Sequence, residues 1–209
     1  MSRKGTAMGR ASRADAAKHR EEVVAATSRL LRERGSARMS VQDLMAAAGF
    51  THGGFYKHFR SKEELVGVAA ATAFDELLTM LTRILDESPD RPQARAELLR
   101  RYLSPEHRDS PGIGCPATAL AGDAARAPAG SPLRKSYVAG VEGVVERLAE
   151  YDGAPEQGDA EARRRAIVDL AAMVGALTLA RATEQSALSG EILQVVHDAV
   201  AGQPEPRAR

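Results

Sequence analysis

The sequence predicts an all-α protein with a small N-terminal helical domain and a larger C-terminal helical domain. Only 4% of its 209 residues are aromatic and tryptophan is absent, while 44% are hydrophobic, so the core must consist mainly of aliphatic side chains. Long segments rich in Ala, Leu, Glu and Arg, residues with high helix propensity, carry their apolar members at helical spacing. The length suits one domain or two small ones.

The first two predicted helices lie within residues 23–48. Apolar side chains follow helical spacing over Val23–Leu31, and Gly35 ends this helix because glycine accepts the left-handed conformation at a helix C-terminus. Ser40 is the expected N-cap of a short helix over 41–48. Asp43 falls in its first turn, where a negative charge is favourable.

A third and a fourth helix follow closely. Gly49 ends the second helix, and Thr51 is expected to cap a third that runs through Phe59. Ser61 caps a fourth, which continues as one long helix through residue 85. Two short helices joined by a tight glycine turn indicate a helix-turn-helix.

The stretch GFTHGGFYKHF, residues 49–59, has an unusual composition for a short helix. Phe55 and Phe59 are one turn apart and are expected to point into the small core. Gly53 and Gly54 weaken a helix by about 1 kcal/mol each relative to alanine, but they allow a close approach to another surface. Residues 56–58 (Tyr, Lys, His) carry groups that contact phosphates and base edges. The alternative is an ordinary helical hairpin with a solvated face.

The charge is divided unevenly along the chain. Through Lys62 there are 13 Lys and Arg against 5 Asp and Glu, a net charge of +8, whereas the remainder carries −7. Nine basic residues lie between Lys18 and Lys62, so the asymmetry does not depend on the N-terminal tail. A basic end on an acidic chain indicates a polyanionic partner for that end.

Residues 39–66, MSVQDLMAAAGFTHGGFYKHFRSKEELV, resemble the tetracycline-repressor (TetR) family of bacterial transcription regulators. The resemblance implies a three-helix DNA-binding domain joined through the fourth helix to a ligand-binding and dimerisation domain. It places Gln42 and His52 where the family reads bases, and Gly53 where other members carry a side chain. The residues expected at the DNA are Ser40, Gln42, Thr51, His52, Gly53, Tyr56, Lys57, His58 and Lys62.

The predicted organisation follows from this comparison and from the helical pattern. Residues 1–17 are expected to form a flexible basic tail, 18–60 the helix-turn-helix domain, 61–201 the ligand-binding and dimerisation domain, and 202–209 a second flexible tail. Further helices are expected over 95–103, 116–125, 133–151, 161–183 and 189–201, with loops at 104–114 and 152–159.

The last two predicted helices carry a candidate dimerisation face. Small residues on one side of the helix over 161–183 permit a close helix approach, and apolar residues of the last helix lie beside them. Here too the chain resembles the family, whose last two helices pair with their symmetry mates in a four-helix bundle. The alternative is that both helices pack only within one subunit. The face comprises Ala171, Val174, Gly175, Thr178, Ile192, Val195 and Val196.

Cys115, the only cysteine, is the candidate sensing residue. It precedes Pro116 and is therefore expected at a helix N-cap, where the helix dipole stabilises a thiolate. His107 and Arg108 would add positive charge if their loop folds back. The Gly-Cys-Pro loop also resembles a subset of the family in which such a cysteine senses electrophiles or oxidants. The alternative, ranked slightly ahead, is a buried small residue lining a ligand pocket.

The predicted function is a homodimeric DNA-binding repressor, released from a palindromic operator by a small molecule or an electrophile. One cysteine allows no intrachain disulfide, and the N-terminus lacks a secretory signal, so a reducing cytoplasm is expected. No metal, cofactor or membrane is expected. Two alternatives remain: an enzyme using Cys115, His107 and Asp109, and a dimeric interaction module that does not bind DNA.

Overall fold

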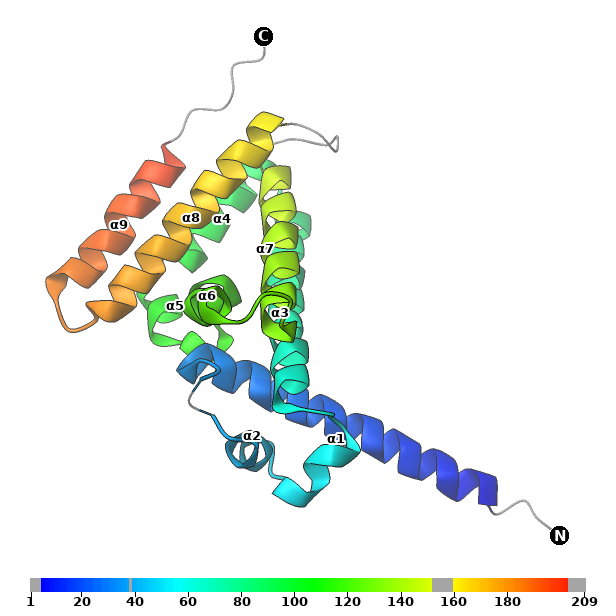
Figure 1. Ribbon diagram of the computed structural model, residues 1–209. Coiled ribbons are helices and arrows are strands. Elements are labelled where there is room, and N and C mark those ends of the chain that lie inside the picture. The colour runs from blue at the N-terminus through cyan, green and yellow to red at the C-terminus, as the bar shows by residue number, and fades with distance from the viewer. Residues whose placement is uncertain (1–4, 38, 152–159, 203–209) are drawn as a thin grey trace.

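The computed structural model of the protein describes residues 5–37, 39–151 and 160–202, and its regular elements are helical throughout, as predicted (Figure 1). A long first helix crosses one end of the molecule, and the helix-turn-helix segment packs beneath it. The elements are α1 (Gly5–Arg34), α2 (Val41–Ala47), η1 (His52–Lys57), α3 (Lys62–Glu87), α4 (Arg91–Tyr102), α5 (Pro105–Asp109), η2 (Pro111–Ile113), α6 (Pro116–Arg126), α7 (Pro132–Tyr151), α8 (Ala160–Ala182) and α9 (Ala187–Ala201).

Buried side chains form two separate cores that share the helix α3. The smaller core brings α1, α2 and η1 together around Phe55 and includes Leu65 near the start of α3. The larger core contains Phe74 and Ile84 of α3, with buried residues of α4, α6, α7, α8 and α9. The helix therefore extends from the N-terminal domain into the C-terminal domain and fixes one against the other.

Close packing of α3 against α7 depends on two glycines (Figure 1). A Cβ atom at Gly67 of α3 would lie 2.5 Å from the Pro132 Cβ, and one at Gly140 of α7 would lie 2.1 Å from the Phe74 ring. Side chains at these positions would force the helices apart. By length and composition α3 could cross a membrane, but half of its most apolar window is buried within the protein.

The end of α1, both ends of α2 and the start of α3 agree with the predicted signals. Gly35 has a φ of +72° just after α1, and Gly49 has a φ of +79° after α2. The Ser40 hydroxyl accepts a hydrogen bond from the Asp43 amide, and the Ser61 hydroxyl accepts one from the Glu64 amide. These local contacts explain why the boundaries of α2 and α3 could be read from sequence.

Three expectations about secondary structure were wrong. The third helix is a 3-10 helix over His52–Lys57, and Thr51 precedes it without a side-chain capping bond. The predicted loop at 104–114 contains α5 and η2, because Ser104 caps α5 and prolines begin both elements. The first helix begins at Gly5 within the segment predicted as a tail, where alanines favour helix. The expected loop at 152–159 and tail at 203–209 lie outside the described residues.

Candidate nucleic-acid interface and cavity

The start of α2 is fixed by reciprocal hydrogen bonds between Ser40 and Asp43. The Asp43 amide donates to the Ser40 hydroxyl at 3.2 Å, and the Ser40 amide donates to the Asp43 carboxylate at 2.8 Å. The Ser40 hydroxyl and amide together lower the pKa of Asp43, so its carboxylate is ionised at the positive end of the helix. This cap leaves Gln42 exposed in the first turn of α2.

The 3-10 helix η1 is anchored by aromatic rings that face inward. Phe55 and Phe59 are buried, and their ring centroids are 5.7 Å apart. The Arg20 guanidinium lies 5.0 Å from the centroid of the Phe59 ring and holds α1 beside it. With the phenyl rings inside, the Tyr56 side chain points outward and is 69% exposed.

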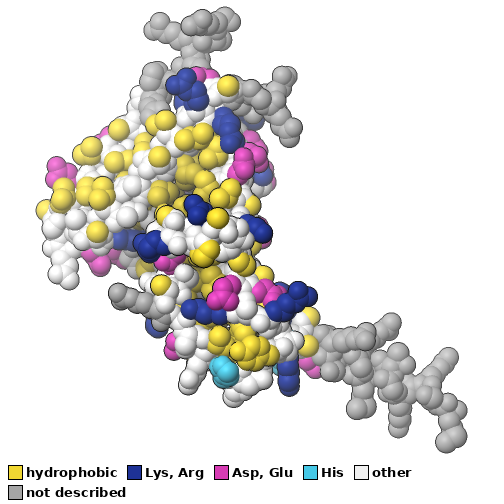
Figure 2. Space-filling model, viewed as in Figure 1, with side chains coloured by type: hydrophobic (Ala, Val, Ile, Leu, Met, Phe, Trp, Pro, Cys, Tyr) yellow, Lys and Arg dark blue, Asp and Glu magenta, His cyan; other side chains and the backbone are white. Residues whose placement is uncertain are grey.

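The nine residues expected at the DNA form an accessible polar surface. Each is exposed or half-buried: Ser40, Gln42, Thr51, His52, Gly53, Tyr56, Lys57, His58 and Lys62. A Cβ at Gly53 would meet nothing within 4 Å, so the fold itself does not require glycine there. Figure 2 shows Lys and Arg side chains and a histidine on the exposed part of this domain. The surface offers hydroxyl, amide, imidazole and ammonium groups to a polyanion.

The connection between α1 and α2 is tied to the C-terminal domain by Asp123 of α6. The Ser36 amide donates a short hydrogen bond to the Asp123 carboxylate. A Cβ at Gly35 would lie 2.8 Å from the same carboxylate. The Asp123 carboxylate also accepts a hydrogen bond from Arg126 at 2.9 Å. The C-terminal end of α6 therefore holds the segment that leads from α1 into the helix-turn-helix.

The N-terminal end of α6 borders a cavity of about 500 Å³. Side chains of α3 and α4, including Leu77, Met80 and Leu98, give it apolar walls. The cavity is also lined by Cys115 and by Arg32, which lies two residues before the end of α1. The cavity thus lies where the N-terminal domain meets the C-terminal domain.

Cys115 occupies the N-cap position of α6, as predicted, but its side chain makes no capping hydrogen bond. The residue is only 2% exposed and lies beside Tyr102. Burial, with the adjacent Cys115, raises the pKa of the Tyr102 hydroxyl above its ordinary value. Cys115 is therefore a buried residue lining the cavity, which agrees with the alternative ranked ahead for it.

His107 does not supply the positive charge that was expected beside Cys115. Its Nδ1 lies 2.7 Å from the Tyr102 carbonyl oxygen, and its Nε2 accepts the Cys115 amide hydrogen at 3.1 Å. Burial lowers the pKa of His107, which favours the neutral ring that this pairing requires. The Arg108 guanidinium pairs with Asp109 and donates to the Ser189 hydroxyl at 3.0 Å.

This geometry separates the three residues considered for an enzyme. His107 contacts the backbone amide of Cys115, and the Asp109 carboxylate binds Arg108 instead of orienting the imidazole. The arrangement is that of structural hydrogen bonds rather than a nucleophile, base and orienter. Across the described residues, no group of three or more His, Cys, Asp or Glu side chains is placed to hold a metal ion.

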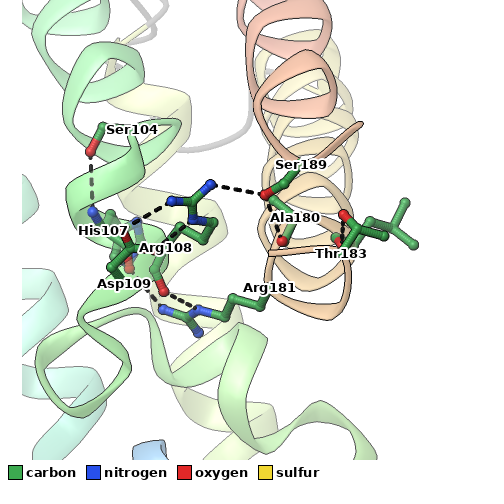
Figure 3. Close-up of polar contacts among 9 residues, drawn as sticks. Ser104, His107, Arg108, Asp109, Ala180, Arg181, Thr183 and Ser189 are labelled. Carbon is green, nitrogen blue, oxygen red and sulfur yellow. Dashed lines mark hydrogen bonds and ion pairs between the residues drawn. The ribbon is translucent and has the colours of Figure 1, made fainter. Parts of the chain in front are cut away.

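A polar network connects the cavity wall to α8 and α9 (Figure 3). The Arg181 guanidinium of α8 donates to the carbonyl oxygens of His107 and Arg108, each at 3.0 Å. The Ser189 hydroxyl, which accepts from Arg108, donates in turn to the Ala180 carbonyl at 2.8 Å. Arg181 thus caps the C-terminal carbonyls of α5, and Arg108 ties α5 to the start of α9.

The predicted dimerisation residues lie on α8 and α9. Ala171, Thr178 and Val195 are exposed, whereas Val174, Gly175, Ile192 and Val196 are half-buried. Val168 and Leu179 of α8 and Leu188 of α9, which were not predicted, add exposed apolar area. Hydrophobic side chains are visible across these two helices in Figure 2. The two helices thus present an apolar surface that the described residues of the single chain leave exposed.

Comparisons with known proteins agree with this architecture. Residues 23–69 match the family model for bacterial regulatory proteins of the tetR family. These residues therefore form a domain of the TetR family. This match covers the second half of α1, α2, η1 and the start of α3, the elements that supply most of the smaller core.

Curated relatives match less than half of the chain. It is 38% identical over 88 residues to the HTH-type transcriptional repressor Rv3405c of Mycobacterium tuberculosis, covering 40% of this chain and 42% of that one. It is 31% identical over 96 residues to the HTH-type transcriptional repressor DhaR of a Mycobacterium species, covering 46% of this chain and 47% of that one. The matched segment thus spans less than half of these relatives' length.

Solved structures match the chain over nearly its full length. The reduced form of E. coli NemR superimposes with a TM-score of 0.76 at 21% identity, covering 91% of this chain and all of that one. A TetR transcriptional regulator from Chloroflexus aurantiacus gives 0.73 at 25% identity, covering 90% of this chain and 94% of that one. The N-terminal and C-terminal helices together have the fold of TetR regulators.

Several important side chains escaped the sequence-based predictions. Arg32, Glu76, Asp123 and Arg181 act through partners far away in the sequence. A single charged residue in a helical stretch gives no signal for such pairing. The one available signal was that Arg32, a charged residue, falls on the apolar face of α1.

Proposed function

We propose that this protein is a DNA-binding transcription regulator that acts as a repressor in the cytoplasm. The main support is the exposed polar surface of η1 and α2, held in place by buried phenyl rings and a capping box within a basic domain. Lys57 and Lys62 supply charge for phosphates, while Gln42 and His52 offer amide and imidazole groups to base edges.

The regulator is proposed to bind as a homodimer through α8 and α9. Exposed Val168, Leu179 and Val195 flank the small residues Ala171 and Gly175. Burial of this surface against a second copy would remove its apolar side chains from water. Two subunits would then engage two half-sites whose centres lie about 34–36 Å or a multiple apart.

The signal is proposed to be a small molecule that occupies the cavity between α1, α3 and α4. A cavity of about 500 Å³ falls in the range of ligand sites. An electrophile acting on Cys115 is a second candidate, favoured by the position of the residue at the wall of the same cavity. In either case the signal enters beside the N-terminal end of α6, whose other end holds Ser36.

Selection of bound sequences from a random duplex library tests the DNA proposal. We expect enrichment of a palindrome and retention that falls steeply with salt, since phosphate contacts release counterions. Lack of enrichment, together with salt-independent retention, would contradict DNA binding.

Operator release by N-ethylmaleimide tests the thiol. If Cys115 is the sensor, wild type should be released and Cys115→Ser should stay bound. Equal release of both proteins would leave the cavity as the only candidate for the signal.

A further inference from the structure

Arg32 is a buried cation at the wall of the cavity. It lies near the C-terminal end of α1, and its side chain is only 5% exposed, whereas Arg29 and Arg34 of the same helix are exposed. Burial of a charge is unfavourable unless it is paired and hydrogen-bonded. A guanidinium retained at this depth therefore calls for partners on more than one side.

Glu76 of α3 forms an ion pair with one of the nitrogen atoms of this guanidinium. Arg32 Nη2 lies 2.7 Å from Glu76 Oε2, and the Glu76 side chain is 48% exposed. Arg32 Nε is fully buried, and within the described part of the chain it has no hydrogen-bond partner. An arginine side chain carries five N–H donors in a fork that matches a carboxylate. The site thus combines a buried cation, unused donor capacity and a counterion that can move into solvent.

The other cations near the cavity are already engaged. Glu97 accepts from Arg100 at 2.7 and 2.8 Å and from Arg101 at 2.5 Å, and these arginines lower its pKa to about 2. The Arg181 guanidinium binds the carbonyls at the end of α5. Arg32 is therefore the group best placed to select the charge of a ligand.

The walls beside Arg32 favour an apolar ligand body. Leu77 and Met80 of α3 and Leu98 of α4 line the cavity, and Ile113 at its edge is 72% exposed. A cationic ligand could approach Glu76 but would be repelled by the buried guanidinium. A neutral apolar ligand would leave the donors of Arg32 unused.

We propose that the cavity binds a small amphipathic carboxylic acid as the effector. Its carboxylate pairs with Arg32 and displaces Glu76 toward solvent, while its apolar body lies along Leu77, Met80 and Leu98. This inference rests on the proposed function of the cavity as the effector site. Because the Arg32–Glu76 pair connects α1 to α3, the acid replaces a contact between the two domains with a contact to the ligand.

Matched ligand pairs test the charge requirement. Decanoate, phenylbutyrate and their uncharged amides are titrated into the full-length protein by calorimetry. At least one acid should bind, and it should bind about tenfold or more tightly than its amide, because only the carboxylate forms a charge-assisted pair. Equal affinities for acid and amide, or no binding by either acid, would overturn the proposal.

Variants then locate the contact. Arg32→Met keeps the length of the side chain and should abolish the preference for acid, whereas Glu76→Gln should tighten acid binding by removing a competing carboxylate. Arg83→Met, on an exposed part of α3, is the matched control and should keep the preference. A folded Arg32→Met protein that still prefers the acid would contradict the assignment.

A second measurement covers the case in which Arg32→Met does not fold. Arg32→Lys retains the charge but loses the forked geometry, so its preference should be weaker than that of wild type. An unchanged preference in both Arg32→Lys and Glu76→Gln would overturn the site.

Operator retention is measured on the same protein without acid. Retention without any acid preference would remove this inference and leave the regulator. Acid preference without operator retention would keep this inference and contradict the proposed DNA-binding function.

Discussion

The outer surface of the N-terminal domain and the cavity at the domain junction present their polar groups in opposite directions. In the N-terminal domain, a closed aromatic core holds Tyr56, His52 and Lys57 outward into solvent. At the junction with the C-terminal domain, Arg32 of α1, Tyr102 and Cys115 face inward around a cavity and are buried. Outward groups can be changed with little effect on folding, whereas each inward group is part of the packing. The effects of substitutions on binding and on stability should therefore separate at the outer surface and remain coupled at the cavity.

The largest effect is expected from a charge on the surface shared by α8 and α9. Ala171→Arg should give monomers and weaken operator binding by about a hundredfold or more, because a monomer binds a single half-site without the avidity of a dimer. Sedimentation and titration with operator DNA measure the two quantities. Val138→Arg replaces an apolar residue on α7 that is 56% exposed, and it should leave both unchanged. A dimeric Ala171→Arg protein would contradict the assigned surface.

Two glycines allow the stability of the domain junction to be tested. Gly35→Ala places a side chain at a φ of +72° and against Asp123, so unfolding should cost about 1–2 kcal/mol less than in wild type. Gly53→Ala enters open space and should change stability by less than about 0.5 kcal/mol. Urea denaturation distinguishes them. Equal losses would show that the Asp123 contact contributes little.

Substitutions on the outward surface should change binding without changing folding. Lys62→Ala and Tyr56→Phe should weaken binding to all duplexes, and Lys62→Ala should reduce the salt slope by about 1. Gln42→Ala and His52→Ala should instead alter sequence preference. Competition titrations measure both effects, with Lys135→Ala on exposed α7 as the control. If all four variants bind like wild type, this surface is not the interface.

The smallest effect concerns pH and the inward-facing His107. Burial in the folded state lowers the pKa of His107 below its ordinary value of 6.5. As the pH falls, the unfolded chain therefore binds this proton before the folded protein does. The contribution of His107 to stability should be complete above pH 6.5 and lost as the pH falls below that value toward the folded pKa. Denaturation between neutral and mildly acidic pH measures this slope, and His107→Gln should flatten it. An identical slope in the variant would assign the dependence to other groups.

The sequence revealed one domain more fully than the other for a physical reason. Ser40, Asp43, Phe55 and Phe59 act through neighbours three or four residues away, so their spacing predicted the caps and the inward rings. The 3-10 form of η1 was missed because apolar spacing over one turn does not distinguish 3-10 from α-helix.

The cavity depends on contacts over long sequence separations. Arg32 pairs with Glu76 because α1 packs near α3, and Arg181 binds the His107 carbonyl because α5 packs near α8. Cys115 was placed correctly at a helix start because proline follows it. The charge state of His107 could not be predicted, since it depends on burial and on the Tyr102 carbonyl.

The hydrogen bonds from Arg108 and Arg181 have a thermodynamic consequence. They join the wall of the cavity to α8 and α9, the same helices that carry the proposed contact between subunits. If a ligand that shifts α5 alters subunit association, then association must alter ligand affinity by the same free energy. The apparent ligand affinity would then depend on the total concentration of the protein itself.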